Sequence, residues 1–306
     1  MKKKLDLTTG NIYKDLLLVA LPTLASSLVQ MAYNLTDMYW VGQLFYENEA
    51  VAAVATGGFY MWFGFGLIML VKIGTSVNVS HAVGRNDEQA LEKIGNNGFI
   101  LMLGVAILYT FVGVFGGKYF VDFFGYDNDL VITYAYQYLG TISTFVIAMF
   151  MVHLVNGIYD GLGLTIMTFL VSFIGAVLNM ILDPIFIHET VTIFGMTING
   201  LGLEVQGAAT ATVISQSFVL LVYITIYIGK NRPFHLHPLK YFDIESMKKI
   251  LKIGYPIALQ SVLFTIIAVF ITRMQSQYGF NIVATQRLGS QLEAFAWMIA
   301  SGFQVA

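Results

Sequence analysis

Two aspartates lie inside long apolar stretches of this sequence, where a charged side chain is costly. Asp37 belongs to the run DLLLVALPTLASSLVQMAYNLTDMYWV, and Asp183 belongs to the run VSFIGAVLNMILDPIFI. A carboxylate at the centre of a membrane helix costs roughly 2.5–3.5 kcal/mol on insertion scales, and such groups face a bundle interior or a water-filled cavity. The pair therefore indicates a membrane protein that moves a solute.

Other polar side chains repeat at helical spacing around these aspartates. Asn179 precedes Asp183 by four residues, which places both on one helix face. Similar stripes are formed by Gln30, Tyr33 or Asn34, and Asp37, by His153 and Asn156, and by Thr212 and Gln216. Oxygen ligands of this kind suit a hard cation such as Na⁺, and two close carboxylates also favour a bound proton because like charges resist sharing a site. The residues leave H⁺ and Na⁺ equally open.

Each of these residues also has a purely structural interpretation. Asp37 could be an interfacial residue near the outer end of its helix, and Asp183 could be a helix-end residue before a proline. Asn156, Asn179 and Thr212 could serve only as hydrogen bonds between helices, worth about 0.6–2 kcal/mol each. From the residues alone, the two aspartates are therefore the firm candidates.

The composition predicts an all-α integral membrane protein, built as a polytopic helical bundle. Of 306 residues, 57% are hydrophobic and only 11% are charged, and the mean hydropathy is +0.72. Soluble domains carry about 25% charged residues. The absence of Cys excludes disulfides and thiolate metal sites. The five His are scattered and no nucleophile or metal motif is present, so we expect neither an enzyme nor a nucleic-acid partner.

Eight segments are long and apolar enough for transmembrane helices, which need about 20 residues. They are Asp15–Val41, Val51–Val83, Gly95–Gly116, Val131–Ile158, Thr165–Ile187, Gly207–Ile228, Ile250–Met274 and Ile282–Ala306. Lys and Arg set the orientation, and twelve of the sixteen lie in or next to three segments on one side. We predict a multi-pass protein of the cell membrane, in contact with its lipids, with a cytoplasmic amino terminus. The outer segment PIFIHETVTIFGMTING could form a small hairpin.

The seventh span repeats the start of the first. KDLLLVALPTLASSL (14–28) aligns with KKILKIGYPIALQSV (248–262), so that Pro22 matches Pro256. Six helices, a basic linker and a second start are typical of transporters built from two parallel halves. We predict a six-helix amino-terminal lobe (1–229), a cytoplasmic linker (230–249), and the first two helices of a second lobe (250–306). The chain stops within a span, so we expect the second lobe to be truncated, and the oligomeric state stays open.

Two charged residues of the last span have no obvious partner. Arg287 and Glu293 are six residues apart, which is poor spacing for a pair on one helix face. Glu293 could bind a cationic substrate.

Six segments, in this order, make the chain similar to the multidrug and toxic compound extrusion (MATE) family. They are TDMYWVGQL, AVAAVATGG, HAVGRNDEQA, LNMILDPIFI, QGAATATVISQ and GYPIALQ. The resemblance covers almost the whole chain and implies twelve helices in two six-helix lobes, with cation-driven efflux of amphipathic drugs. One departure is NGIYDGLGLTIMTF, where Asp160 and Leu164 stand in place of the basic residue and the Gly-Asp-Thr usual in the family.

The resemblance also implies site residues, through the DinF-like branch whose ion site lies in the amino-terminal lobe. The positions that match its cation site are Asp37, Asn156, Asn179, Asp183 and Thr212, those that match its substrate cavity are Gln30, Tyr33 and Tyr138, and Pro22 matches a helix-bending hinge. Another branch has a carboxylate in the seventh helix, where this sequence has Phe264 and the span Ile250–Met274 holds no Asp or Glu. This comparison favours the amino-lobe site.

The sequence as a whole predicts a secondary antiporter of the MATE type. Inward movement of H⁺ or Na⁺ would drive export of amphipathic, often cationic small molecules by alternating access, with no cofactor besides the coupling ion. One alternative is a lipid-linked precursor flippase of the same superfamily, for which we expect a strongly basic cavity although the amino-terminal lobe offers only Lys72. Another is a non-transporting fragment.

Overall fold

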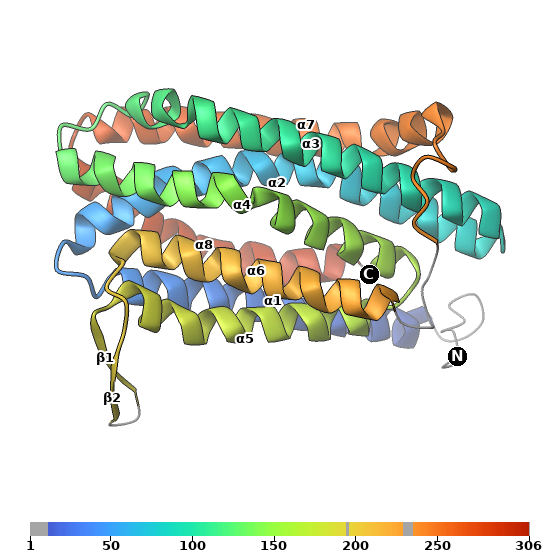
Figure 1. Cartoon of the computed structure of the whole chain (residues 1–306), viewed down its shortest axis with the longest axis horizontal. Coiled ribbons are helices and arrows are strands. Elements are labelled where there is room, and N and C mark those ends of the chain that lie inside the picture. The colour runs from blue at the N-terminus through green and yellow to red at the C-terminus, as the bar shows by residue number, and fades with distance from the viewer. Residues whose placement is uncertain (1–11, 194–195, 229–234, 306) are drawn as a thin grey trace.

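The computed structural model describes residues 12–193, 196–228 and 235–305, without the side chains of residues 12–20, 22–23, 26–27, 193, 196, 291 and 295–305. Over these ranges, long helices run along the main axis of an elongated bundle (Figure 1). The helices are α1 (Ile12–Val41), α2 (Glu47–Gly84), α3 (Glu88–Asp122), α4 (Asp129–Gly161), α5 (Thr165–Ile187), α6 (Glu204–Ile228), α7 (Ile244–Ser276) and α8 (Phe280–Val305). The predicted all-α, polytopic fold is confirmed.

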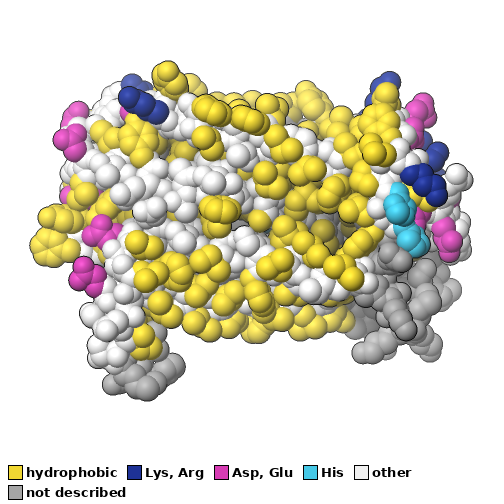
Figure 2. Space-filling view, in the orientation of Figure 1, with side chains coloured by type: hydrophobic (Ala, Val, Ile, Leu, Met, Phe, Trp, Pro, Cys, Tyr) yellow, Lys and Arg dark blue, Asp and Glu magenta, His cyan; other side chains and the backbone are white. Residues whose placement is uncertain are grey.

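The surface of the bundle is that of a membrane protein. Among the described residues, the six helices α2 to α7 are long and apolar enough to cross a membrane. The helices α1 and α8 have 30 and 26 residues, which also exceeds the length needed. Figure 2 shows apolar side chains over the middle of the bundle and charged side chains gathered at its two ends. Charges thus lie where water and headgroups would be.

The central helix of the bundle is α2, which packs against α3, α4 and α7, while α1 packs against α5 and α8. The core around α2 and α4 contains side chains with no exposed surface, such as Ile68, Phe150 and Leu154. The first helix of each predicted half thus meets the second helix of the other half, as α1 with α8 and α2 with α7. This reciprocal pattern fits the internal repeat seen in the sequence.

The helices α2 and α7 cross at two glycines. A Cβ atom on Gly254 would lie 1.8 Å from the carbonyl oxygen of Leu70, and one on Gly74 would lie 2.0 Å from that of Ile250. Only residues without a side chain permit backbones to approach this closely, as small residues do between membrane helices. The contact between the predicted lobes is therefore direct backbone packing at this level.

The two ends of the bundle differ in their connections. Figure 1 places the start of α1, the α2–α3 connection and the start of α7 at one end, which is the predicted cytoplasmic side. At the other end, β1 (Thr190–Ile193) and β2 (Met196–Asn199) form an antiparallel hairpin, in which Thr190 pairs with Asn199. The small hairpin expected in this segment is confirmed.

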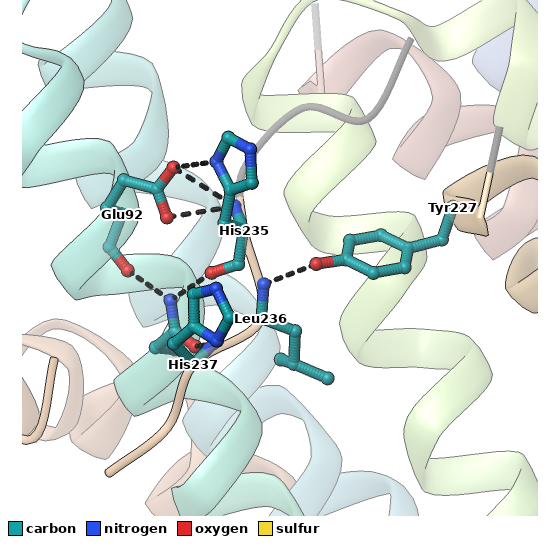
Figure 3. A network of polar contacts seen from close by, with 6 residues as sticks. Glu92, Tyr227, His235, Leu236 and His237 are labelled. Atoms are coloured by element: carbon teal, nitrogen blue, oxygen red, sulfur yellow. Dashed lines mark hydrogen bonds and ion pairs between the residues drawn. The ribbon is translucent and has the colours of Figure 1, made fainter. Parts of the chain in front are cut away.

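The segment that joins α6 to α7 is docked on α3 (Figure 3). The carboxylate of Glu92 accepts the backbone N–H of His235 at 2.9 and 3.0 Å, and the ring Nδ1 of His235 lies 2.8 Å from the same carboxylate. The backbone N–H of Leu236 donates to the hydroxyl of Tyr227. Because the His235 side chain is 54% exposed, this ion pair alone adds little stability.

Two asparagines of α3 bind the same segment more deeply. Asn96 and Asn97 have no exposed surface. The amide of Asn96 donates to His235 O at 2.8 Å and accepts His237 N–H at 2.7 Å. The amide of Asn97 donates to the carbonyl of Tyr241 at 2.7 Å and accepts the backbone N–H of the residue before α7 at 3.0 Å. The linker is thus fixed to the amino-terminal lobe by buried amide groups.

The start of α7 lies inside the range assigned to the linker. α7 begins at Ile244 rather than at residue 250, because the carboxylate of Asp243 caps the backbone N–H groups of Glu245 and Ser246. The hydroxyl of Ser246 donates to the same carboxylate, and this bond chiefly lowers the pKa of Asp243. Hydropathy alone missed this polar first turn, because it marks only the apolar part of a helix.

Candidate cation site

The two predicted carboxylates meet in the interior, where α1 packs along α5 (Figure 1). Asp183 has no exposed surface, and Asp37 lies within electrostatic range of it. Within the described part of the chain, Oδ1 of Asp37 and both carboxylate oxygens of Asp183 are buried without a hydrogen-bond partner. Buried carboxylates are costly unless they bind a cation, a proton or hydrogen-bond donors. A proton, a cation or a hydrogen-bond donor would each satisfy these oxygens.

The ends of α1 and α5 are held together near these carboxylates. His188 follows α5, and its Nε2 lies 3.2 Å from the carbonyl oxygen of Trp40 in α1, with the two rings packed edge to face. Burial lowers the pKa of His188, which favours its neutral form. Pro184 lies within the last turn of α5 and has no N–H to donate.

A small polar cavity of about 60 Å³ lies beside the carboxylates, between α1, α4, α5 and α6. Five predicted site residues line it, namely Gln30, Tyr33, Asn156, Asn179 and Thr212. The hydroxyls of Tyr33 and Thr212 are 3.1 Å apart and join α1 to α6 across the cavity. Four helices therefore bring polar side chains to one place, and the sequence spacing had placed these side chains on one face of each helix.

The two asparagine side chains of this cavity differ in how many further hydrogen bonds they can form. Asn179 is 1% exposed, and within the described structure neither its Oδ1 nor its Nδ2 has a hydrogen-bond partner. The Oδ1 of Asn156 already accepts a hydrogen bond from the hydroxyl of Tyr223. Asn179 is therefore the better placed of the two to bind a ligand directly.

Tyr138 of α4 also lies near the two carboxylates. Its ring packs against Gly57, where an added Cβ atom would lie 2.3 Å from the ring. Its hydroxyl lies 3.8 Å from the sulfur of Met61 and within electrostatic range of Asp37 and Asp183. Tyr138 is thus near the carboxylates although it does not line the 60 Å³ cavity.

The size of the cavity decides what it can hold. A volume of about 60 Å³ corresponds to roughly two water molecules at about 30 Å³ each, whereas pockets for drug-sized ligands measure about 300–1,000 Å³. The cavity therefore suits an inorganic cation or a proton with water, and in this arrangement it does not accommodate a drug. Gln30 and Tyr33, predicted to bind substrate, share this lining with three of the predicted cation ligands, Asn156, Asn179 and Thr212.

Three further residues concern the site, namely the predicted hinge Pro22 and the residues Ser215 and Arg287, which were not predicted to belong to it. Pro22 lies in α1, but its side chain is outside the described residues. Ser215 lines the cavity with a buried hydroxyl that has no partner among the described atoms, and its position three residues after Thr212 could have indicated it. Arg287 of α8 lies within electrostatic range of Asp37. The sequence feature that could have indicated Arg287 is the presence of a charged residue inside an apolar span.

These features define a multi-pass membrane protein, a helical bundle that buries a pair of carboxylates beside a small polar cavity. Comparison with known families then places it more narrowly. The model of the MatE family matches residues 22–185, which is more than half of the chain. The chain belongs to the MatE family.

Individual relatives support this assignment. The chain is 24% identical over 299 residues to "Probable multidrug resistance protein NorM" of Thermotoga maritima, covering 96% of this chain and 61% of the relative. It is 25% identical over 294 residues to "Probable multidrug resistance protein YpnP" of Bacillus subtilis, covering 94% of this chain and 62% of the relative. The chain thus spans about three fifths of the length of these curated relatives.

Solved structures show the same fold. A structure of the "MATE multidrug transporter DinF-BH" superposes with a TM-score of 0.85 at 23% identity, covering 99% of this chain and 66% of the other. A transporter from Pyrococcus furiosus, described as a member of the MOP superfamily, superposes with a TM-score of 0.83 at 23% identity, covering 100% of this chain and 65% of the other.

Proposed function

We propose that this chain forms part of a cation-coupled antiporter of the MATE type, which exports amphipathic, often cationic small molecules by alternating access. The observation that carries the proposal is the pair Asp37 and Asp183, in which Oδ1 of Asp37 and both carboxylate oxygens of Asp183 are buried without a hydrogen-bond partner among the described residues. A site of this kind binds a positive charge, and its position between packed helices makes its affinity sensitive to how those helices are arranged.

Each polar group has a role in this mechanism. Asp37 and Asp183 accept the inward-moving H⁺ or Na⁺, while Asn179, Asn156 and Thr212 supply neutral oxygen ligands or orient water. For Na⁺, these oxygens are the type that hard cations prefer. For H⁺, the two like charges favour binding because one proton removes their repulsion. The same geometry thus serves either ion.

The organic substrate requires another space. The 60 Å³ cavity is too small for it, so the substrate would bind between the two lobes, where Tyr138 and the carboxylates would face it. Known relatives support a small-molecule substrate, since a solved MATE structure is described in complex with Br-NRF. Others are described as inward-facing and outward-facing conformations, which supports alternating access, with Pro22 proposed as the bend of α1.

The alternative from the same superfamily is a lipid-linked precursor flippase. Its substrate carries phosphate, so its cavity should be strongly basic. The described residues that line the 60 Å³ cavity include no Lys or Arg, so the candidate cation site itself offers no cationic group to a phosphate. A non-transporting fragment is the other alternative, and the experiment below distinguishes all three.

The test is drug efflux in drug-sensitive cells that express the complete gene. Wild type is compared with Asp37→Asn and Asp183→Asn while the proton and sodium gradients are collapsed separately. We expect each substitution to reduce efflux at least tenfold, and we expect one gradient to be required. The matched control is Asp129→Asn, which changes an exposed carboxylate in the first turn of α4 and should leave efflux intact.

The outcomes separate the alternatives. Normal efflux by both site variants, with protein shown in the membrane, would reject the carboxylate site. No efflux by wild type would favour the flippase or a fragment. Transport of a lipid-linked precursor would then identify the former, and a native mass near that of a 306-residue chain without any transport would identify the latter.

A further inference from the structure

A long groove of about 800 Å³ lies between α4 and α6 on the surface of the bundle. Both helices contribute to its lining, with residues that include Tyr136, Gly140, Phe145, Gln206, Phe218 and Leu221. The helices of the second predicted lobe pack on α1, α2 and α3, and Figure 1 shows α4 and α6 in front of α8. The groove therefore opens away from the second lobe, toward the surrounding membrane.

The length of the groove matches one leaflet of a bilayer. Both α4 and α6 begin at the end of the bundle that carries the hairpin (Figure 1). From Tyr136 to Phe145 the lining of α4 extends about 14 Å, and from Gln206 to Leu221 the lining of α6 extends about 22 Å, at 1.5 Å for each residue. Half of a hydrocarbon core of about 30 Å is about 15 Å. The groove thus runs from one membrane surface to about the middle of the bilayer.

The deeper part of the groove suits a hydrocarbon chain. Phe145, Phe218 and Leu221 line it and are exposed. The hydroxyls of Thr144 and Thr210 donate to carbonyl oxygens of their own helices, at 2.9 and 2.8 Å, so they do not require a polar ligand. An exposed apolar surface at membrane depth contacts acyl chains, and a groove fixes one of them in place.

The mouth of the groove carries charges of both signs. The hydroxyl of Tyr136 donates to Oδ1 of Asp122 at 2.5 Å and lies 3.5 Å from the backbone carbonyl oxygen of Lys118, which places the last turns of α3 beside the mouth. The side chains of Lys118 and Asp122 are exposed, and within the described part of the chain neither belongs to an ion pair. Both charges are therefore available to a ligand that is itself a zwitterion.

We propose that the groove binds a phospholipid with a primary ammonium headgroup, of the kind found in phosphatidylethanolamine. One acyl chain lies in the groove, the phosphate lies near the ammonium group of Lys118, and the headgroup ammonium donates to the carboxylate of Asp122. Charge-assisted hydrogen bonds of this kind are stronger than neutral ones. A choline headgroup has no N–H to donate, and a glycerol headgroup carries no cation. This site goes beyond the proposed antiport function and does not depend on it.

The test measures lipid binding to the purified full-length protein by native mass spectrometry. The protein in detergent is titrated separately with phosphatidylethanolamine, phosphatidylcholine and phosphatidylglycerol that have identical acyl chains. We expect phosphatidylethanolamine to half-saturate one site at a concentration at least fivefold lower than the other two lipids require.

A first pair of variants tests the groove itself. At Gly140 an added Cβ atom would have no neighbour within 4 Å, so Gly140→Phe fills the groove without disturbing the packing of the helices. We expect this variant to bind phosphatidylethanolamine at least fivefold more weakly. The matched control is Gly104→Phe, because Gly104 is an exposed position of α3 where an added Cβ atom also has no neighbour within 4 Å. This control should bind the lipid as wild type does.

A second set of variants tests the headgroup contacts. Asp122→Asn retains an oxygen that accepts the Tyr136 hydroxyl but removes the charge, so phosphatidylethanolamine should lose its advantage over phosphatidylcholine. Lys118→Gln should weaken binding of all three lipids, because each of them carries a phosphate. Asp127→Asn removes an exposed carboxylate from the connection between α3 and α4, and it should leave the preference unchanged.

Three results would overturn the proposal. The first is equal affinity for the three headgroups in wild type. The second is unchanged binding of phosphatidylethanolamine in folded Gly140→Phe protein. The third is a dimer without bound lipid that dissociates in Gly140→Phe, because the groove would then be a contact between two copies of the chain. These results are read from binding alone, so they are independent of the efflux test of Asp37 and Asp183.

Discussion

The crossing of α2 and α7 provides a sharp test of the contact between the lobes. In Gly254→Ala, the new methyl carbon would lie 1.8 Å from the carbonyl oxygen of Leu70 and 2.6 Å from its carbonyl carbon. Favourable contacts require roughly 3.5 Å. These are backbone atoms in the middle of a helix, so no side-chain rotation can relieve the clash, and α2 and α7 must separate by about 1.7 Å.

The expected cost follows from this overlap. Overpacking of a tight interface typically costs about 1–3 kcal/mol, and replacing glycine by alanine in a helix returns about 0.4–1 kcal/mol by restricting the unfolded chain. We therefore expect a net loss of about 1–2 kcal/mol. At about 2–4 °C for each kcal/mol, the unfolding temperature should fall by several degrees.

The assay is thermal unfolding in detergent, followed by tryptophan fluorescence. Gly104→Ala is the matched control, since Gly104 is exposed in α3 and an added Cβ atom would have no neighbour within 4 Å. This control should raise the unfolding temperature slightly. The same replacement of glycine by alanine should therefore change the stability in opposite directions at the two positions. A Gly254→Ala protein as stable as Gly104→Ala would refute the close crossing of α2 and α7.

Further tests concern the linker, the cap of α7 and the cavity. Asn97→Ala removes two buried hydrogen bonds to the linker backbone, so stability should fall by about 1–3 kcal/mol, and limited proteolysis should cut the linker faster. Asp243→Asn tests a carboxylate whose pKa is lowered chiefly by the Ser246 hydroxyl. Because its pKa is lowered on folding, Asp243 stabilises the protein above about pH 4, and stability curves of variant and wild type should converge as the pH falls through the lowered pKa. Thr212→Val removes a hydroxyl that bonds across the cavity and should reduce coupled efflux several-fold. Thr225→Val, whose exposed hydroxyl bonds to its own helix, should transport as wild type does.

Much of the fold was predictable because apolar spans in a membrane protein are marked by length and composition. The span Thr165–Ile187 matches α5 at both ends, since it is bounded by polar and glycine-containing segments. The other helices begin earlier than predicted, and in α3, α4 and α7 the first turn is polar and is capped by the side chain of the residue before it. The start of α7 at Ile244 is the clearest case, since the cap by Asp243 leaves no trace in hydropathy.

The candidate site was predictable in part for a different reason. The spacing of Asn179 and Asp183 identifies one helix face, but a single sequence does not state which helices pack together. The meeting of Asp37 with Asp183 depends on the packing of α1 against α5, and the approach of Arg287 depends on α8. Partners separated by more than a hundred residues left no local pattern, so Arg287 could be noted only as an unpaired charge.

The docked linker also holds one end of α7 against the amino-terminal lobe. The bond from Asn97 fixes the chain at Asp243, one residue before α7 begins. With 33 residues at 1.5 Å each, α7 is about 50 Å long. A lever of that length, held at the end next to the linker, moves its far tip by about 0.9 Å for each degree of rotation. If the docked linker serves as the pivot of α7, a rotation of a few degrees there would move the far end of the helix by several ångströms.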